Sequence, residues 1–264
     1  MKLRVLADNN TFINMYYLGE PAVSYYIEDE GECILFDAGY SDAYIKNAES
    51  MGIDLRKVTK LVISHGHNDH TGGLPYILKM GNNMEVITHP KTFVKKEARG
   101  EDIGSPWDEN MIREYAKITL SKEPVNITKN LIYLGEIPQT TNFEKRDIIG
   151  TTDNDNHPDD IIEDSALCLK TDKGLFIITG CSHSGICNIL EYAKKISGDK
   201  RIYGVIGGFH LFDKDERLKE TLEYLKSEHI PNLYPCHCIS LDAKVEMGKV
   251  MDIKEVGVGL EVDV

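Results

Sequence analysis

A histidine-rich loop is the feature that most restricts what this chain can fold into. Residues 64–70 read Ser-His-Gly-His-Asn-Asp-His, directly after the apolar run 61–63 and before the helix-like stretch 72–80. Three imidazoles and a carboxylate within six residues are ligands that Zn²⁺, Fe²⁺ and Mn²⁺ accept readily. In open α/β sheets, ligands also collect where a strand turns into a helix. The sequence therefore predicts a metal site at the carboxyl end of a buried strand.

A second strand–loop–helix unit follows later in the chain. Residues 179–185 read Thr-Gly-Cys-Ser-His-Ser-Gly between an apolar run and a helical pattern. This repetition, without a Pro/Gly/Ser-rich linker, fits an α/β fold: an αββα sandwich of two pseudo-repeated halves with the site between two central sheets. We expect a single domain over residues 1–264. Residues 89–128 are a possible lid or insertion, although a pair of surface helices is an equally good interpretation.

Local patterns predict the other elements. β-branched and aromatic residues on either side of Asp/Gly turns predict two hairpins, and Gly52 is expected to end a helix. The predicted strands are 23–27, 33–36, 60–63, 84–88, 166–170, 175–179, 201–206, 232–234 and 256–260. The predicted helices are 42–51, 74–80, 109–117, 186–196, 216–228 and 243–250, and the polar residues 139–164 are predicted to form a long loop.

Composition excludes several classes of function. The chain has no run of about 18 apolar residues, so we expect no membrane span. Its first residues become polar too early for a secretory segment, which favours a cytoplasmic protein. The net charge of −13 argues against nucleic acid as a partner and leaves a small molecule as the expected one. Six cysteines without a Cys-x-x-Cys pair do not indicate a disulfide framework.

Several segments together resemble a known family. They are Ser-Tyr-Tyr-Ile at 24–27, Cys-Ile-Leu-Phe-Asp-Ala-Gly at 33–39, the loop at 64–74, the loop at 179–185, Gly-Gly-Phe-His at 207–210 and Pro-Cys-His-Cys at 235–238. In this order, and with His-x-His-x-Asp-His at 65–70, the chain resembles the metallo-β-lactamase fold superfamily over nearly its whole length. More narrowly, it resembles the branch of 7,8-dihydropterin-6-methyl-4-(β-D-ribofuranosyl)-aminobenzene 5′-phosphate synthases. The resemblance implies the same αββα fold.

The resemblance also implies a set of metal ligands. His65 and His67 match the family's ligands of one metal, while Asp69, His70 and His237 match those of a second. We therefore expect one or two divalent transition metal ions, with zinc favoured over iron or manganese.

Two positions depart from the family pattern. Cys181 stands where the family has a bridging aspartate, and it is either a thiolate ligand or a buried thiol. The family's histidine before the later hairpin is replaced by Glu163-Asp164-Ser165. We expect His183 to supply the missing ligand, with helix capping or an outer role as the alternative. Asp164 is a ligand, an orienter of a ligating imidazole or a turn residue.

The expected chemistry is that of a metal-dependent hydrolase. A metal-activated water attacks a phosphate ester or related anion, Asp69 orients the water, and His210 donates a proton or binds the substrate's phosphate, unless it is a structural histidine. Two alternatives stay open: a transferase that displaces pyrophosphate from a dihydropterin, and a metal-loaded binding protein without catalysis.

Cys236 and Cys238 alternate with His237 and are expected to point away from the site. The oligomeric state is left open.

Overall fold

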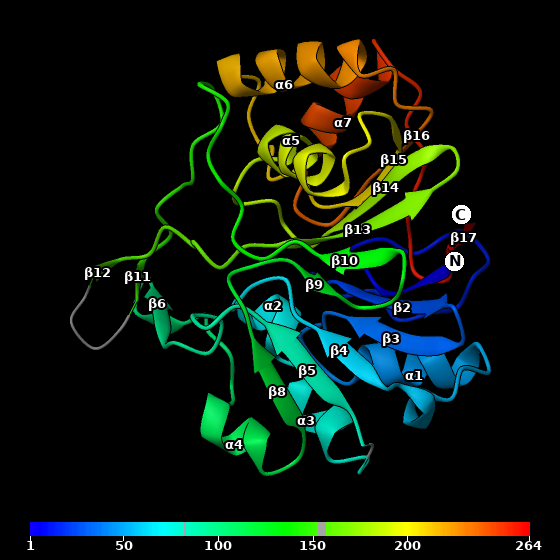
Figure 1. Cartoon of the computed structure of the whole chain (residues 1–264), viewed down its shortest axis with the longest axis vertical. Helices are drawn as coiled ribbons and strands as arrows, with labels where there is room; N and C mark the ends of the chain where they lie inside the picture. The colour runs from blue at the N-terminus through cyan, green and yellow to red at the C-terminus, as the bar shows by residue number, and fades with distance from the viewer. Residues whose placement is uncertain (82, 153–156) are drawn as a thin grey trace.

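The computed structural model describes residues 1–81, 83–152 and 157–264, and arranges them in four layers (Figure 1). Two β-sheets face each other in the centre, and helices cover the outer face of each sheet. This is the expected αββα sandwich. Helices α1 (Ala43–Ser50) and α3 (Leu74–Leu78) cover one sheet. Helices α5 (Ile186–Ser197), α6 (Glu216–Ser227) and α7 (Leu241–Gly248) cover the other.

The two sheets are built on a similar plan. The first has the order β17 (Glu261–Asp263), β1 (Lys2–Ala7), β2 (Ser24–Asp29), β3 (Glu32–Phe36), β4 (Lys60–Val62), β5 (Glu85–Thr88), β8 (Lys117–Leu120). The second has the order β16 (Asn232–Pro235), β15 (Ile202–Gly207), β14 (Gly174–Thr179), β13 (Ala166–Thr171), β10 (Leu131–Tyr133), β9 (Val125–Asn126). In each, an antiparallel hairpin (β2–β3 or β13–β14) is followed by parallel strands. The pseudo-repeat read from the sequence is thus present in the topology.

Smaller elements lie between the main ones. They are the 3-10 turn η1 (Leu55–Lys57), helices α2 (Asn68–Thr71) and α4 (Glu109–Arg113), and a small sheet of β12 (His157–Pro158), β11 (Thr151–Thr152), β6 (Lys96–Ala98) and β7 (Glu101–Asp102). None of the helices in the described ranges is long and apolar enough to cross a bilayer.

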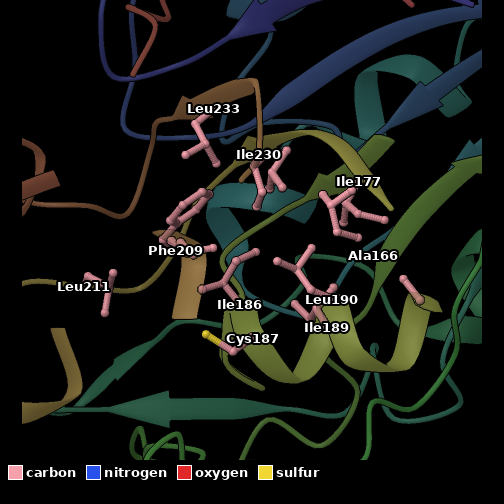
Figure 2. Close-up of a cluster of buried hydrophobic side chains, with 14 of the residues drawn as sticks. Ala166, Ile177, Ile186, Cys187, Ile189, Leu190, Phe209, Leu211, Ile230 and Leu233 are labelled. Carbon is pink, nitrogen blue, oxygen red and sulfur yellow. The ribbon is translucent and has the colours of Figure 1, made fainter. Parts of the chain in front are cut away.

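A separate hydrophobic cluster fills each interface of the sandwich. Strand β14 contributes to two of them, since Ile177 packs toward α5 while its neighbour Ile178 packs between the sheets. This alternation follows from the two-residue period of a strand, and it explains why β14 is an unbroken apolar run. Figure 2 shows part of the cluster beneath the helices, including Ile186 and Leu190 of α5 beside Ile177.

The structure confirms most predicted elements and corrects a few. Both hairpins, the strand before the histidine-rich loop and α1, α3, α5, α6 and α7 lie where they were predicted, within a few residues. Helix α1 ends before Gly52, whose φ of +73° lies in the left-handed region. The final strand is β17 at 261–263 and not 256–260. The predicted helix 109–117 ends at Arg113, because Lys117 begins the edge strand β8. Strand β1 was not predicted.

Candidate metal centre

The two histidine-containing loops meet at one edge of the sandwich. Residues 64–70 join β4 to α2, and residues 180–185 join β14 to α5. Each loop follows the carboxyl end of a strand: β4 is parallel to both of its neighbours, and β14 is parallel to β15 and antiparallel to β13. The fold therefore brings together side chains that lie more than 100 positions apart in the sequence.

Three buried imidazoles form a first group of candidate ligands. In this three-histidine group, the ligand nitrogens of His65, His67 and His183 lie within 4.8 Å of one another, and His65 Nε2 is 3.1 Å from His67 Nδ1. Both nitrogens of His183 are buried without a hydrogen-bond partner. Burial lowers the pKa of His67 to about 4 and the pKa of His65 and His183 well below their ordinary value. The rings are therefore neutral at pH 7, as metal ligands must be.

A second group mixes ligand types. In this mixed group, the ligand atoms of Asp69, His70, Cys181 and His237 also lie within 4.8 Å of one another. His70 Nε2 is 3.2 Å from Cys181 Sγ, and His237 Nε2 is 3.2 Å from Asp69 Oδ2. Carboxylate, imidazole and thiol together match the donors that zinc accepts. The family resemblance placed His65 and His67 in one site and Asp69, His70 and His237 in another. The structure groups these residues in the same way, with His183 in the first group and Cys181 in the second.

Electrostatic interactions set the charges of the mixed group. Burial opposes the charge on His70, but Asp69 and Asp37 outweigh it and raise the pKa of His70 to about 9. Burial would raise the pKa of Asp69, but His70 and His237 hold it well below its usual range. Burial and the adjacent Cys238 raise the pKa of the Cys181 thiol. A bound cation would displace the protons of His70 and Cys181.

Hydrogen bonds from residues around the centre fix the orientation of three candidate-ligand imidazole rings. Asp37 Oδ2 lies 2.7 Å from His70 Nδ1 and accepts a bond from Ser64 Oγ, which is itself 2.9 Å from His65 Nδ1. On the other side, Asn9 Oδ1 is 3.0 Å from His237 Nδ1. With Nδ1 engaged outside, the Nε2 atoms of these three histidines point into the site, as in many metal centres. Asp37 therefore supports His70 directly and His65 through Ser64, and Asn9 supports His237.

Asp164 does not belong to either group of candidate ligands. One of its carboxylate oxygens accepts a 2.8 Å hydrogen bond from Ser184 N, and burial raises its pKa to about 6. This hydrogen bond stabilises the loop that contains His183, on the side away from the candidate ligands. Of the three roles left open for Asp164, its contacts fit that of a residue supporting a neighbouring ligand.

His210 lies beside the three-histidine group. Its ring centroid is 4.3 Å from that of His183, and its Nδ1 is 3.3 Å from Asp147 Oδ2. Four non-glycine residues around the centre have φ between +50° and +63°, namely Asp37, Ser182, His210 and His237. Such backbone conformations cost free energy and concentrate at functional sites.

A cavity of about 420 Å³ opens over both groups. Its lining includes Asp69, Cys181, His183 and His210, together with Ile103 from the predicted insertion. Cys238 also lines the cavity and donates to the carbonyl of Cys181 at 3.2 Å. The expectation that Cys238 points away is therefore wrong, because His237 has a φ of +53° and the segment is not extended there.

A buried ion cluster beneath the histidine-rich loop was missed by sequence reasoning. Lys96 Nζ lies 2.6 Å from Asp159 and 2.8 Å from Glu163, and all three side chains are at most 4% exposed. Glu163 also accepts a hydrogen bond from Gly66 N at 3.4 Å. A Cβ at residue 66 would lie 2.8 Å from the Lys96 side chain and 2.2 Å from the Thr92 carbonyl, so only glycine fits. No motif in the sequence distinguishes Lys96 from the neighbouring Lys95.

Comparison with known proteins gives consistent results. The family model described as the metallo-beta-lactamase superfamily matches residues 18–195. A protein of Methanocaldococcus jannaschii named 7,8-dihydropterin-6-methyl-4-(beta-D-ribofuranosyl)-aminobenzene-5′-phosphate synthase is 31% identical over 262 residues, which covers 92% of this chain and 89% of that protein. A second protein of this archaeon, whose name calls it uncharacterized, is 32% identical over 94% of each chain.

A solved structure is similar over the full length. It is the crystal structure of a metal-dependent hydrolase of the β-lactamase superfamily, with 28% sequence identity and a TM-score of 0.85. The similarity covers 100% of this chain and 99% of that one.

Proposed function

The chain belongs to the metallo-β-lactamase superfamily, and on that premise we propose that it is a metal-dependent hydrolase. In this proposal the substrate is a phosphate ester or a related anionic small molecule, and the attacking group is a metal-activated water. The observation that supports it best is the pair of adjacent donor groups, one of three neutral imidazoles and one of mixed type. Both donor sets suit zinc, with iron or manganese as alternatives.

The three-histidine group and the mixed group would each hold one ion. Ions bound there would lower the pKa of a water and balance negative charge that develops during the reaction. Asp69, which belongs to the mixed group and lines the cavity, would accept a hydrogen bond from the attacking water and orient it. His210, which lines the cavity with its Nδ1 3.3 Å from Asp147 Oδ2, would donate a proton to the leaving oxygen.

Metal depletion and reloading test the hydrolase proposal. Protein stripped by a chelator is expected to lose activity on a panel of phosphodiesters and phosphomonoesters, and to regain it with Zn²⁺, Fe²⁺ or Mn²⁺. Equal activity with and without a metal would contradict the proposal. Tight metal binding without turnover of any ester would favour the reading as a metal-loaded binding protein.

A second candidate is a transferase that displaces pyrophosphate from a dihydropterin. It is supported by the relative that is named as a dihydropterin-linked synthase and is 31% identical over most of both chains. The same donor groups could bind a pyrophosphate leaving group. Pyrophosphate release that requires both a pterin diphosphate and an aromatic acceptor would establish this activity; release without the acceptor would indicate hydrolysis.

The proposal also covers the partner and the cellular location of the protein. A small molecule is the proposed partner, because the chain has 43 acidic and 30 basic residues and nucleic acid would be repelled. A cytoplasmic location fits six cysteines that are all free.

A further inference from the structure

The residues that line the cavity over the candidate metal centre are of two chemical kinds. The first kind comprises four candidate ligands together with Cys238 and His210. The second kind, called the apolar side below, is uncharged; its only polar side-chain groups are the amide of Asn68 and the hydroxyl of Tyr40, and its other members are Pro21, Ile103, Ile149 and Phe212. Among the lining residues that the structure describes, none is a lysine or an arginine. Within this lining, the positive charge that stabilises a bound anion would therefore come from the metal ions and from histidine.

Two cationic side chains close to the centre are paired with carboxylates. Lys96 is enclosed by Asp159 and Glu163, and Arg217 NH1 is 3.0 Å from Asp147 Oδ2. A substrate with several negative charges requires charge-assisted bonds from such groups. Outside the metal centre, the lining of the cavity offers no lysine or arginine for such bonds.

The apolar side is held in place by backbone hydrogen bonds. Ile103 N donates to Lys96 O at 3.1 Å, and Ile103 O accepts from Asn68 N at 2.8 Å. Ile149 N donates to Asp159 O at 2.9 Å. Both isoleucines are thus linked to the segments that contact the histidine-rich loop. The ring of Phe212 makes a T-shaped contact with that of His210, with 4.8 Å between the ring centroids.

We propose that the substrate has one anionic reacting centre attached to an uncharged, apolar body about the size of an aromatic ring. This inference rests on the proposed hydrolase and specifies its substrate. The anionic centre lies over the two donor groups, and the body contacts Ile103, Ile149 and Phe212. A volume of about 420 Å³ falls in the usual range of small-molecule pockets. Apolar surface of the body is then removed from water, which favours binding.

Binding of three phosphonates to the zinc-loaded protein tests the inference by calorimetry. Methylphosphonate has the reacting centre alone, phenylphosphonate adds the apolar ring, and 4-carboxyphenylphosphonate adds a remote second charge. We expect phenylphosphonate to bind at least about tenfold more tightly than methylphosphonate, a difference of about 1.4 kcal/mol. We expect the carboxylate to remove most of that gain. Equal affinities for phenyl and methyl, tightest binding of the carboxylate, or no binding at all would each overturn the inference.

Matched variants test whether the apolar side causes the preference for phenylphosphonate. Ile149→Ala and Phe212→Ala are expected to reduce the phenyl-to-methyl ratio to less than about threefold without changing methylphosphonate affinity. Leu241→Ala, which shortens a 77% exposed side chain of α7, is the control and should leave all three affinities unchanged. Ile149→Lys is expected to make 4-carboxyphenylphosphonate the preferred ligand, a gain that loss of folding could not produce. A ratio that survives all three cavity variants would contradict the assignment of the apolar side.

The same zinc-loaded protein separates this inference from the proposed function. Hydrolysis of phosphate esters without a preference among the phosphonates would reject the substrate class and keep the hydrolase. A clear preference for phenylphosphonate without any ester hydrolysis would support the ligand class and reject the hydrolase.

Discussion

At the scale of single residues, the centre combines side chains whose charges are set by burial and by one another. The three-histidine group is neutral because burial disfavours imidazolium, while His70 is held charged by Asp69 and Asp37. Unpartnered buried nitrogens, such as both of those in His183, are costly unless something binds them. A bound cation would satisfy one nitrogen of each ring in this group.

Asp69→Asn is the most informative single substitution for catalysis. The amide keeps the shape but loses the charge that helps to bind a cation and orient water, so kcat should fall at least about 100-fold. Steady-state kinetics together with metal analysis would check this. Asp213→Asn changes an exposed aspartate and should have no effect. Retained turnover in Asp69→Asn would remove this residue from the mechanism.

The metal-free protein should lose stability as pH falls. Burial lowers the pKa of His67 to about 4 in the folded state, against about 6.5 when unfolded, so the unfolded state alone binds this proton between those values. The free energy of unfolding should therefore drop by about 3 kcal/mol between pH 6.5 and 4 from this residue. His70 does not offset the loss, because its pKa of about 9 keeps it protonated in the folded state throughout that window.

Urea unfolding at several pH values measures this slope. The dependence should become shallower in His67→Gln and stay unchanged in His229→Gln, which alters an exposed histidine. A slope that is the same in all three proteins would show that His67 is not held neutral by the fold.

At the scale of secondary-structure elements, the histidine-rich loop is supported by a buried ion cluster centred on Lys96 of β6. Lys96 begins β6, and its two carboxylate partners lie in the segment before β13. This cluster connects two long irregular regions directly beneath Gly66.

Lys96→Met should destabilise the protein by about 3–5 kcal/mol, because two buried carboxylates lose their counter-charge. Lys46→Met removes an exposed i,i+4 ion pair with Asp42 and should cost less than about 0.5 kcal/mol. Chemical denaturation of both variants gives the comparison. If the two substitutions cost the same, the buried cluster is not a structural support.

Elements with a strong local pattern could be predicted from the sequence, and those defined by distant contacts could not. The hairpins and α5 have clear periodicity and turn residues, so their positions were predicted correctly. Strand β8 is four residues long and exists because it pairs with β5, which no local pattern reveals. In the centre, His65, His67 and His70 were identified by their spacing, and His237 by its match to the family pattern. The roles of Lys96 and Cys238 were not predicted, because they depend on which segments the fold places next to the histidines.

At the scale of the whole molecule, the candidate ligands connect the two halves of the sandwich. The loop after β4 supplies His65, His67, Asp69 and His70, while His183 and His237 come from the other sheet. A bound ion would therefore stabilise the folded state by mass action, without a counterpart in the unfolded chain.

Chelation should lower the thermal midpoint of unfolding, and added zinc should raise it in a concentration-dependent way. At a free zinc concentration 100 times the dissociation constant, the stabilisation is about 2.7 kcal/mol. Calorimetry across a zinc titration checks this, with Mg²⁺ as a control that imidazole and thiolate ligands do not favour. A midpoint that does not depend on zinc would argue against ligands from both halves.

The central claim is that two groups of side chains from distant segments each bind a transition metal ion. A crystal structure with anomalous scattering recorded at the zinc edge tests it most directly. We expect two peaks, one about 2.0–2.1 Å from nitrogens of His65, His67 and His183, and one bonded to Asp69, His70, Cys181 and His237. Zinc-loaded crystals without anomalous density at either group, or with zinc only at surface residues, would contradict it.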